Sequence, residues 1–230
     1  MSLPQIVLKP KREASIYRKH PWVFSGAIEK IILEESEEEI AEGDLVQVLD
    51  SSEKVVAIGH FSEGSSIAVR LIGFSNEVVD QDFWNQKVAN AYQLRGALGF
   101  ENNSTTNTYR LIHAEGDGLP GLIVDIYRSV AVVQAHSLGM FKSLDQIQLA
   151  LRNVYGNQLD AIYSKSEKAL HRQGEKSTQD TFLYGEKQAP IIVKENDHSF
   201  EIDWIHGQKT GFFIDQRENR RLLQHFSKGK

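Results

Sequence analysis

The chain has 230 residues, of which 40% are hydrophobic and 25% charged, and its formal net charge is -5. These proportions are typical of packed globular proteins and exclude a disordered chain, and the length accommodates two modest domains. The absence of cysteine excludes disulfides, thiolate metal sites and a cysteine nucleophile within these residues. The negative net charge argues against a protein that coats nucleic acid through bulk attraction.

Membrane and export signals are also missing from the sequence. No apolar run approaches the roughly 18 residues of a membrane span, and the start lacks the apolar region of a signal peptide. We therefore expect a cytoplasmic protein that has no membrane partner.

The charges are unevenly distributed along the first part of the chain. Residues 34–44 are strongly acidic, whereas residues 9–20 carry only one acid, Glu13, among many cations. One interpretation is that RNA docks on the basic face and is repelled from the acidic one. The alternative is that both runs are solvated loops. The RNA-binding candidates in the basic run are Lys9, Lys11, Arg12, Arg18 and Lys19.

Residues 5–74 show a pattern of short β segments separated by turns, which predicts a small β-barrel. The expected strands are 5–8, 27–33, 45–49, 55–61 and 67–72. Between the first two lies HPWVF, residues 20–24, in which Trp22 and Phe24 alternate in the manner of a strand.

Two interpretations of these aromatic residues remain open. Trp22 and Phe24 would form an RNA platform with Arg70 as a further phosphate contact. The alternative puts both rings in the barrel core, and we favour it for the aromatics because large apolar side chains are usually buried. The basic residues are then the better RNA candidates.

The residues from 75 onward predict an α+β domain with a sheet covered on one face. Apolar spacing of three to four residues indicates helices at 83–98 and 140–154. Strands are expected at 108–112, 121–127, 130–136, 159–164, 190–194 and 199–204.

Two polar segments of this region invite a functional interpretation. His113, Glu115 and Asp117 have the spacing of one strand face, but Asp117-Gly118 is turn chemistry, so we expect these carboxylates to bond local N–H groups rather than a metal. Lys165, Lys168 and Arg172 are candidates for phosphate contacts, and an exposed loop is the favoured alternative.

The stretch HGQKTGFFIDQRENRRLL, residues 206–223, has the features of a ligand-binding loop that leads into a helix. Gly207 and Gly211 let the backbone bend tightly and approach a bound group, and the residues after them supply an apolar wall. Asp215 is expected to cap a helix over 216–226. Donors, an aromatic wall and a helix start are typical of a small-molecule pocket. The alternative is a structural crossover whose glycines and phenylalanines serve packing alone.

Three stretches of the chain resemble one family, in the family's order: HPWVFSGAIEKI at 20–31, RLIHAEGDGLPGLIVDIY at 110–127 and GQKTGFFIDQRENR at 207–220. They resemble the N-terminal part of the S-adenosylmethionine-dependent RNA cytosine-5 methyltransferases that act on 23S ribosomal RNA and carry a PUA domain. The resemblance implies a PUA-like RNA-binding domain at 1–74 and a central α+β domain at 75–205. It also implies that 206–230 begin a Rossmann-like methyltransferase domain whose remainder is absent from this chain.

The resemblance further implies site residues and a reaction. Methyl transfer to carbon 5 of a cytosine requires a cysteine thiolate that adds to carbon 6, and this chain has none, so we expect it to be inactive alone. Glu115, Asp117 and Pro120 would shape the active site, with no metal. S-adenosylmethionine would lie near Gln208, Lys209, Thr210, Phe213, Asp215 and Arg217.

The alternative function is a non-catalytic RNA-binding or assembly module. Edge strands left unpaired by a missing domain make a homodimer a candidate assembly. Ribosomal RNA is the expected partner in both cases.

Overall fold

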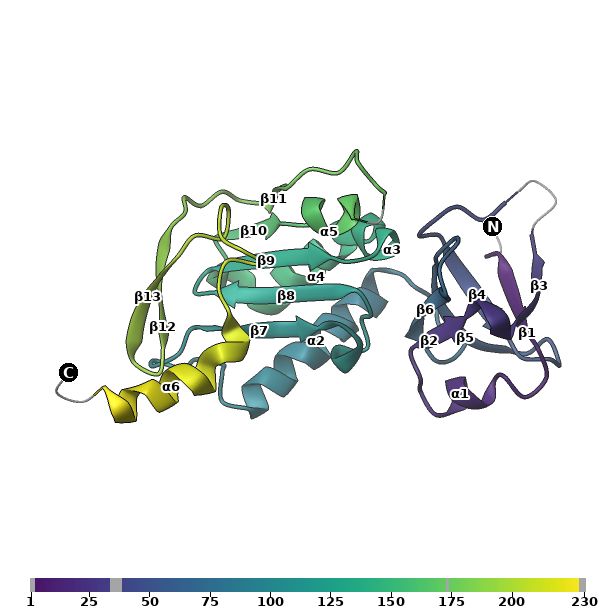
Figure 1. Cartoon of the computed structure of the whole chain (residues 1–230), viewed down its shortest axis with the longest axis horizontal. Helices are drawn as coiled ribbons and strands as arrows, with labels where there is room; N and C mark the ends of the chain where they lie inside the picture. Colours follow the sequence, from purple (N-terminus) through teal and green to yellow (C-terminus); the bar gives the residue numbers. More distant parts are fainter. Residues whose placement is uncertain (1–2, 34–38, 173, 228–230) are drawn as a thin grey trace.

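The computed structural model describes residues 3–33, 39–172 and 174–227. Residues 34–38, which hold much of the predicted acidic run, lie outside the described residues. Figure 1 shows a smaller lobe formed by β1 to β6 and a larger lobe that begins with α2. No helix in the described ranges is both long and apolar enough to cross a membrane.

The smaller lobe is one curled sheet of six strands in the order β2-β6-β5-β4-β1-β3. All neighbouring pairs are antiparallel except β1 and β4, which are parallel. Alternating apolar residues fill its core, including Ile6, Val48 and Leu71. The described strands β2 and β3 end the sheet, so the predicted barrel is open on that side. The elements are β1 (Gln5–Leu8), α1 (Ala14–Tyr17), β2 (Trp22–Phe24), β3 (Ile28–Ile32), β4 (Leu45–Leu49), β5 (Val55–Phe61) and β6 (Ile67–Gly73).

The predicted strands of this lobe are confirmed, and those at 45–49 and 55–61 match β4 and β5 at both ends. The favoured burial of Trp22 and Phe24 is wrong. Val23 between them is the residue that points into the core, with 3% of its surface exposed, whereas Phe24 is 48% exposed. Because side chains alternate across a strand, burying Val23 forces both rings outward.

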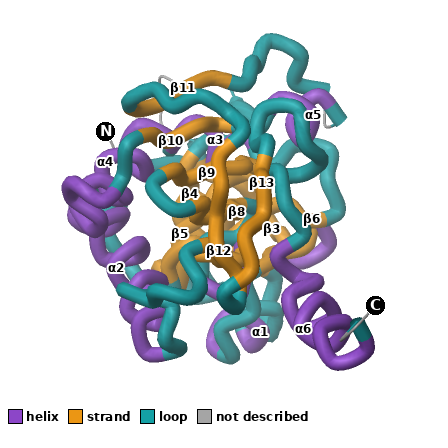
Figure 2. Tube along the Cα trace, turned by 90° about the vertical axis from the view of Figure 1, so that its left-hand side faces the viewer, coloured by secondary structure: helices purple, strands orange, loops and turns teal. Residues whose placement is uncertain are grey.

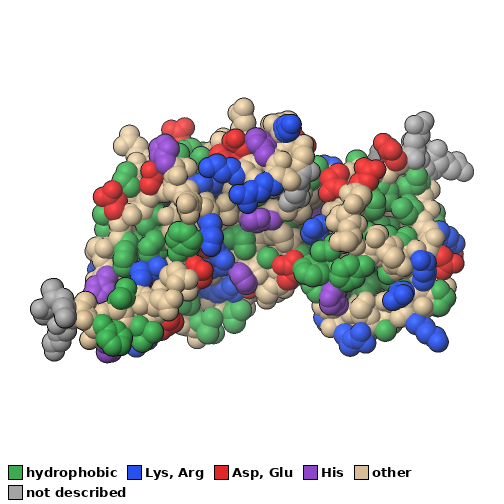
Figure 3. Space-filling model, viewed as in Figure 1, with side chains coloured by type: hydrophobic (Ala, Val, Ile, Leu, Met, Phe, Trp, Pro, Cys, Tyr) green, Lys and Arg blue, Asp and Glu red, His purple; other side chains and the backbone are tan. Residues whose placement is uncertain are grey.

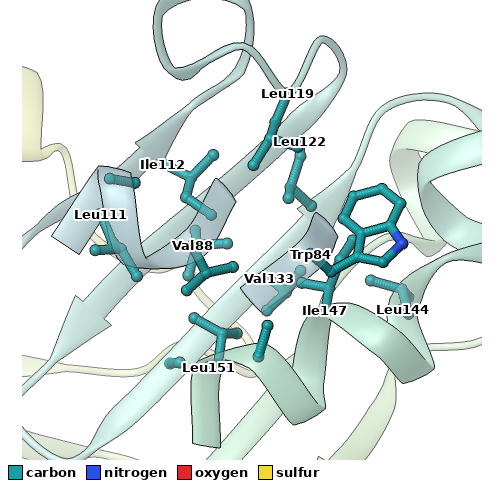
Figure 4. Packing of buried hydrophobic residues seen from close by; sticks show 14 of the residues in the cluster. Trp84, Val88, Leu111, Ile112, Leu119, Leu122, Val133, Leu144, Ile147 and Leu151 are labelled. Atoms are coloured by element: carbon teal, nitrogen blue, oxygen red, sulfur yellow. The ribbon is translucent and has the colours of Figure 1, made fainter. Parts of the chain in front are cut away.

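The larger lobe contains a five-stranded sheet in the order β11-β10-β9-β8-β7. Helices α2 and α4 cover one of its faces, and Figure 4 shows Trp84 and Val88 of α2 and Ile147 and Leu151 of α4 packed against strand residues such as Val133. The elements are α2 (Gln81–Ala97), β7 (Thr108–His113), β8 (Leu122–Tyr127), β9 (Val130–Ala135), α3 (Leu138–Lys142), α4 (Leu144–Tyr155), β10 (Ala161–Ser164), α5 (Glu167–His171) and β11 (Thr181–Tyr184).

The prediction that only one face of the sheet is covered is wrong. Strands β12 (Ile191–Glu195) and β13 (His198–Ile202) form a separate hairpin on the other face. Val193, Ile202 and Trp204 pack there against Tyr127 and Tyr163 of the sheet. Figure 2 shows α2 and α4 on one side of the strands and α5 and α6 (Arg217–Phe226) on the other.

The two lobes meet at α3, where the predicted helix 140–154 is interrupted at Ser143. Gly139 lies directly against the imidazole of His60 on β5, since a Cβ at Gly139 would stand 2.2 Å from the ring Cγ. A Cβ at Gly43 would likewise stand 2.7 Å from the Gly139 nitrogen. The junction therefore requires glycine at both positions.

The first prediction concerns the pH dependence of folding. Burial, with help from the positive charges of Lys142 and Arg70, lowers the pKa of His60 from 6.5 to about 4. Unfolded chains bind a proton at this imidazole below pH 6.5, whereas folded chains do not until about pH 4. The free energy of unfolding should therefore fall with decreasing pH across this window, by at most about 3 kcal/mol.

Urea unfolding of the wild type and of His60→Gln between pH 7 and pH 4.5 measures this contribution. Other titrating groups are common to both proteins, so the difference between the two unfolding free energies should change with pH. Parallel pH curves would show that His60 does not contribute.

Candidate functional site

A buried ionic network lies on the face of the larger sheet that is turned away from α2 and α4. The carboxylate of Asp125 on β8 is fully buried. Arg110 on β7 donates two hydrogen bonds to it, of 2.8 and 3.0 Å, and the hydroxyl of Thr210 donates a third, of 2.6 Å. The hydroxyl groups of Tyr127 and Thr210 are 2.8 Å apart. Thr210 thereby fastens the loop between Gly207 and Gly211 to the sheet.

The charges of this network shift the pKa values of its members. The hydrogen bond to Asp125 raises the pKa of Arg110. Burial, followed by the charge of Asp125, raises the pKa of Tyr127. At neutral pH Arg110 is therefore charged and the Tyr127 hydroxyl is neutral.

Lys165 holds the same loop from the other side. Its ammonium donates to the carbonyl oxygens of Trp204 and of Gly207, the latter at 2.6 Å. Lys165 is 6% exposed, so its predicted place in an exposed loop is wrong. Burial lowers its pKa, the charge of Asp180 opposes this, and Lys168 adds to it.

The two glycines of the loop serve the chain itself rather than a close approach to a ligand. A Cβ at Gly207 would lie 2.3 Å from the carbonyl oxygen of Asp203. Gly211 has a φ of +124°, and a Cβ there would lie 2.8 Å from the Cα of Trp204. The residues between them are folded back onto the preceding turn, which leaves Gln208 and Lys209 exposed at the tip.

A hollow of about 680 Å³ separates this tip from α5. Polar and positively charged side chains form its walls, and Figure 3 shows Lys and Arg gathered over β9 and β10 on this face. Burial, followed by the charges of Arg110 and Arg172, lowers the pKa of His136, so its imidazole is neutral at pH 7. The lining includes Gln134, His136, Lys165, Lys168, Arg172, Asp180, Gln208 and Lys209.

The rest of the predicted cofactor set is divided between exposure and internal bonding. Phe213 is 40% exposed, and the Lys209 ammonium lies 4.7 Å from its ring centre. Arg217 bonds the carbonyl oxygen of Thr108 and, together with Arg220, the buried carboxylate of Glu195. These two arginines are therefore fixed inside the chain rather than directed into the hollow.

Asp215 does not cap the last helix, contrary to the prediction. It lies in a 3-10 turn, Ile214–Gln216, and Gln216 precedes α6 without a side-chain capping bond. Because of this turn the α-helix begins at Arg217, one residue later than predicted, and Gln216 rather than Asp215 occupies the position before it.

The predicted active-site loop follows β7 as a 3-10 turn, Ala114–Asp117. Asp117 accepts hydrogen bonds from the guanidinium of Arg95, at 2.5 and 2.7 Å, and from the His113 N–H at 2.6 Å. The predicted local bonding is thus confirmed for Asp117. Glu115 accepts a 3.0 Å bond from the indole of Trp22 in the other lobe, and Pro120 is buried. Within the described ranges no group of three potential metal ligands is present.

The smaller lobe has its own basic and aromatic pocket, of about 370 Å³, between α1 and β2. Three of the six predicted RNA-binding residues line it, Lys11, Arg12 and Arg18, together with Trp22 and Phe24.

The other three predicted RNA-binding residues lie outside this lining. The ammonium of Lys9 bonds the Gly26 carbonyl oxygen, and that of Lys19 lies over the Phe74 ring. Arg70 bonds the Ser62 hydroxyl at 2.7 Å. The half-buried Trp22 and the exposed Phe24 are functional candidates that general burial preference discounted, and the apolar Val23 between them was the available signal.

The second prediction concerns the bond that fastens the loop. Thr210→Val removes the hydroxyl from Asp125 and Tyr127, and should lower the free energy of unfolding by about 1–3 kcal/mol because a buried carboxylate loses a donor. Urea unfolding measures the change, and Thr210→Ser, which keeps the hydroxyl, is the control. Full stability of Thr210→Val with a loss only in Thr210→Ser would mean that the methyl group, not the hydroxyl, stabilises the loop.

Comparison with known proteins finds one matching domain family and relatives that are named ribosomal RNA methyltransferases. Residues 6–74 match the PUA-like domain family. The chain is 34% identical over 97% of its length to the ribosomal RNA large subunit methyltransferase I of Alteromonas mediterranea, and covers 54% of that protein. It is 37% identical over 98% of its length to the Shewanella denitrificans protein of the same name, and covers 55% of it.

Solved structures share the fold over almost the whole chain. A Streptococcus mutans protein described as a candidate SAM-dependent methyltransferase superposes with a TM-score of 0.77 at 19% identity, over 97% of this chain and 54% of that one. A candidate methyltransferase complexed with SAH gives a TM-score of 0.76, also at 19% identity, over 95% of this chain and 53% of that one. The chain is thus similar over nearly all its length to proteins named ribosomal RNA large subunit methyltransferase I, and spans about half the length of these curated relatives.

Proposed function

We propose that this chain is the RNA-binding and pocket-completing half of an S-adenosylmethionine-dependent methyltransferase. The substrate would be carbon 5 of a cytosine in large-subunit ribosomal RNA, and the enzyme would act in the cytoplasm. The observation that carries the proposal is the collinear similarity, at 34–37% identity over 97–98% of the chain, to relatives named for that class of activity. The carbon-5 position rests on the resemblance of the three sequence motifs.

RNA recruitment is assigned to the smaller lobe, residues 1–74. Its pocket combines cations, which attract phosphates, with the half-buried Trp22 and the exposed Phe24, whose rings would stack on bases. His20, Trp22 and Phe24 lie within 5.7 to 6.3 Å of one another, measured between ring centres, so they present one aromatic surface. Lys11, Arg12 and Arg18 are the strongest candidates, and Lys9, Lys19 and Arg70 would act at the rim.

S-adenosylmethionine, which supplies the methyl group, is assigned to the neighbourhood of the loop between Gly207 and Gly211. Gln208 and Lys209 fit direct contact, because they are exposed beside the hollow and offer an amide and an ammonium group. Phe213 and Asp215 are exposed as well. Thr210 and Arg217 would act by positioning the loop and α6, since their side chains are bonded within the chain. We assign residues 206–230 to the start of a Rossmann-like domain.

The carbon-5 reaction would need groups that these residues do not contain. A thiolate must add to carbon 6 to make carbon 5 nucleophilic, and the sequence holds no cysteine. The thiolate would therefore come from residues outside this chain, and residues 1–230 alone would not transfer methyl groups. Glu115, on the exposed side of its turn, is the member of the predicted active-site loop best placed to meet a partner domain or RNA.

The third prediction tests the reaction. Ribosomal RNA transcribed with cytidine carrying tritium at carbon 5 is incubated with S-adenosylmethionine and the complete gene product that contains these residues. Methylation at carbon 5 displaces that hydrogen, so one tritium should be released to water for each methyl group transferred. Methyl transfer without tritium release would mean that an atom other than carbon 5 is methylated. No transfer at all would favour the non-catalytic RNA-binding or assembly module.

The fourth prediction tests the aromatic surface. Trp22→Ala combined with Phe24→Ala should weaken the binding of a short single-stranded RNA by roughly tenfold or more, since each lost stacking contact costs about 1–3 kcal/mol. Fluorescence anisotropy measures the affinity. Leu222→Ala combined with Leu223→Ala is the matched control, because both side chains are exposed on α6, at the opposite end of the molecule (Figure 1). Equal weakening by the control would assign the effect to a general loss of exposed apolar surface.

A homodimer remains a prediction. Sedimentation of the purified chain at several concentrations would measure the assembly state, and a constant monomer mass would exclude the dimer.

A further inference from the structure

Two exposed cations on α5 border the hollow opposite the loop tip of Gln208 and Lys209. Lys168 and Arg172 stand four residues apart, at α5 and its C-terminal cap, so their side chains share one side of this short helix. Both line the hollow and both are exposed. We propose that Lys168 and Arg172 bind adjacent backbone phosphates of single-stranded RNA, beside a nucleotide that enters the hollow. This inference rests on the proposed function and assigns a second RNA contact, separate from the pocket of the smaller lobe.

The local charge favours a polyanion even though the whole chain is acidic. The lining contains the cations Lys165, Lys168, Arg172 and Lys209 and the acid Asp180, which gives 4 − 1 = +3 in a chain whose net charge is -5. The carboxylate of Asp180 accepts a hydrogen bond from the Glu167 N–H at the start of α5. Among the described residues Asp180 forms no salt bridge with Lys168 or Arg172.

The uncharged polar side chains that line the hollow can form hydrogen bonds with a base, so the hollow suits a whole nucleotide better than a phosphate alone. Gln134 and Gln208 carry amides that both donate and accept hydrogen bonds. A volume of about 680 Å³ lies within the range of about 300–1,000 Å³ that is typical of small-molecule sites. Base edges become accessible to such groups when the RNA is single-stranded.

Cations at the end of a helix also have a structural explanation, because they stabilise its dipole. The last turn of α5 contains both Lys168 and His171. The His171 ring already has partners within the chain, since it bonds the Thr178 carbonyl oxygen at 3.1 Å and lies 3.9 Å from the Glu167 carboxylate. None of the salt bridges among the described residues includes Lys168 or Arg172. Their charges are thus available on the side of the helix that faces the hollow.

The experiment compares RNA affinity and its salt dependence in the 230-residue chain. The probe is a short fluorescein-labelled single-stranded RNA, followed by anisotropy at several salt concentrations. Lys168→Gln combined with Arg172→Gln should raise the Kd about tenfold at low salt. It should also make the slope of log Kd against log salt shallower by about 1.4, since each phosphate contact with a single strand contributes about 0.7. Both residues are exposed, and the urea midpoint verifies that the variant is folded.

The matched control is Arg128→Gln combined with Lys194→Gln. It removes the same two charges at the other end of the sheet, where Arg128 occupies the turn between β8 and β9 and Lys194 lies on β12. If the Kd and its salt dependence change equally in both variants, the cause is the net charge of the chain rather than a site at α5, and the inference is overturned. An unchanged Kd in the α5 variant would also overturn it.

The aromatic variant separates this inference from the proposed function. If Trp22→Ala with Phe24→Ala weakens RNA binding and the α5 variant does not, the RNA contact at α5 is overturned and the RNA-binding role of the smaller lobe is supported. If the wild type does not bind RNA, the α5 site and the RNA-recruiting role of the smaller lobe are both overturned. The tritium release assay still decides the methyl transfer reaction independently.

Discussion

The position of the candidate site depends on one buried charge. Asp125 is completely removed from water, and a carboxylate in that position is stable only if donors replace its hydration. One donor, Arg110, comes from the neighbouring strand, and the other, Thr210, is 85 residues further along the chain. Satisfying this charge therefore brings the segment after β13 back onto the sheet.

The same segment is held a second time by the ammonium of Lys165. That group is buried, so it too requires partners, and it finds them in the carbonyl oxygens of Trp204 and Gly207. Between the two anchors the loop has little freedom, and Gly207 and Gly211 are close-packed against the preceding turn. Gln208 and Lys209 are consequently presented at a fixed place beside the hollow, which is what a preorganised binding site requires.

Regular patterns in the sequence predicted the elements well. Strands β4 and β5 were located at both ends because an alternating apolar pattern specifies both the strand and its buried face. The pattern was weakest at β2, a three-residue strand at the sheet edge. General burial preference decided the expectation for Trp22 and Phe24, and it failed because the intervening Val23 fills the core instead.

Long-range polar contacts could not be predicted in the same way. All the polar residues chosen from the motif after β13 were predicted to contact a ligand. Arg217 instead donates hydrogen bonds to Glu195 and to the carbonyl oxygen of Thr108. Lys165 was assigned to an exposed loop because nothing near it in the sequence indicates its carbonyl partners. Such contacts depend on the hairpin of β12 and β13 lying on the second face of the sheet, and no local periodicity encodes that arrangement.

An acidic chain can present RNA with an attractive surface because charges act over short distances. At physiological salt the Debye length is about 8 Å, so a phosphate responds to the groups nearest to it rather than to the net charge of -5. Cations line two hollows, one in each lobe, and Figure 3 shows Lys and Arg of both lobes on a single face. A strand of RNA held by the smaller lobe would therefore meet a second positive surface on the larger one. The lobes are in close contact at His60 and Gly139, so under the proposed function this junction would set the length of RNA between the two surfaces.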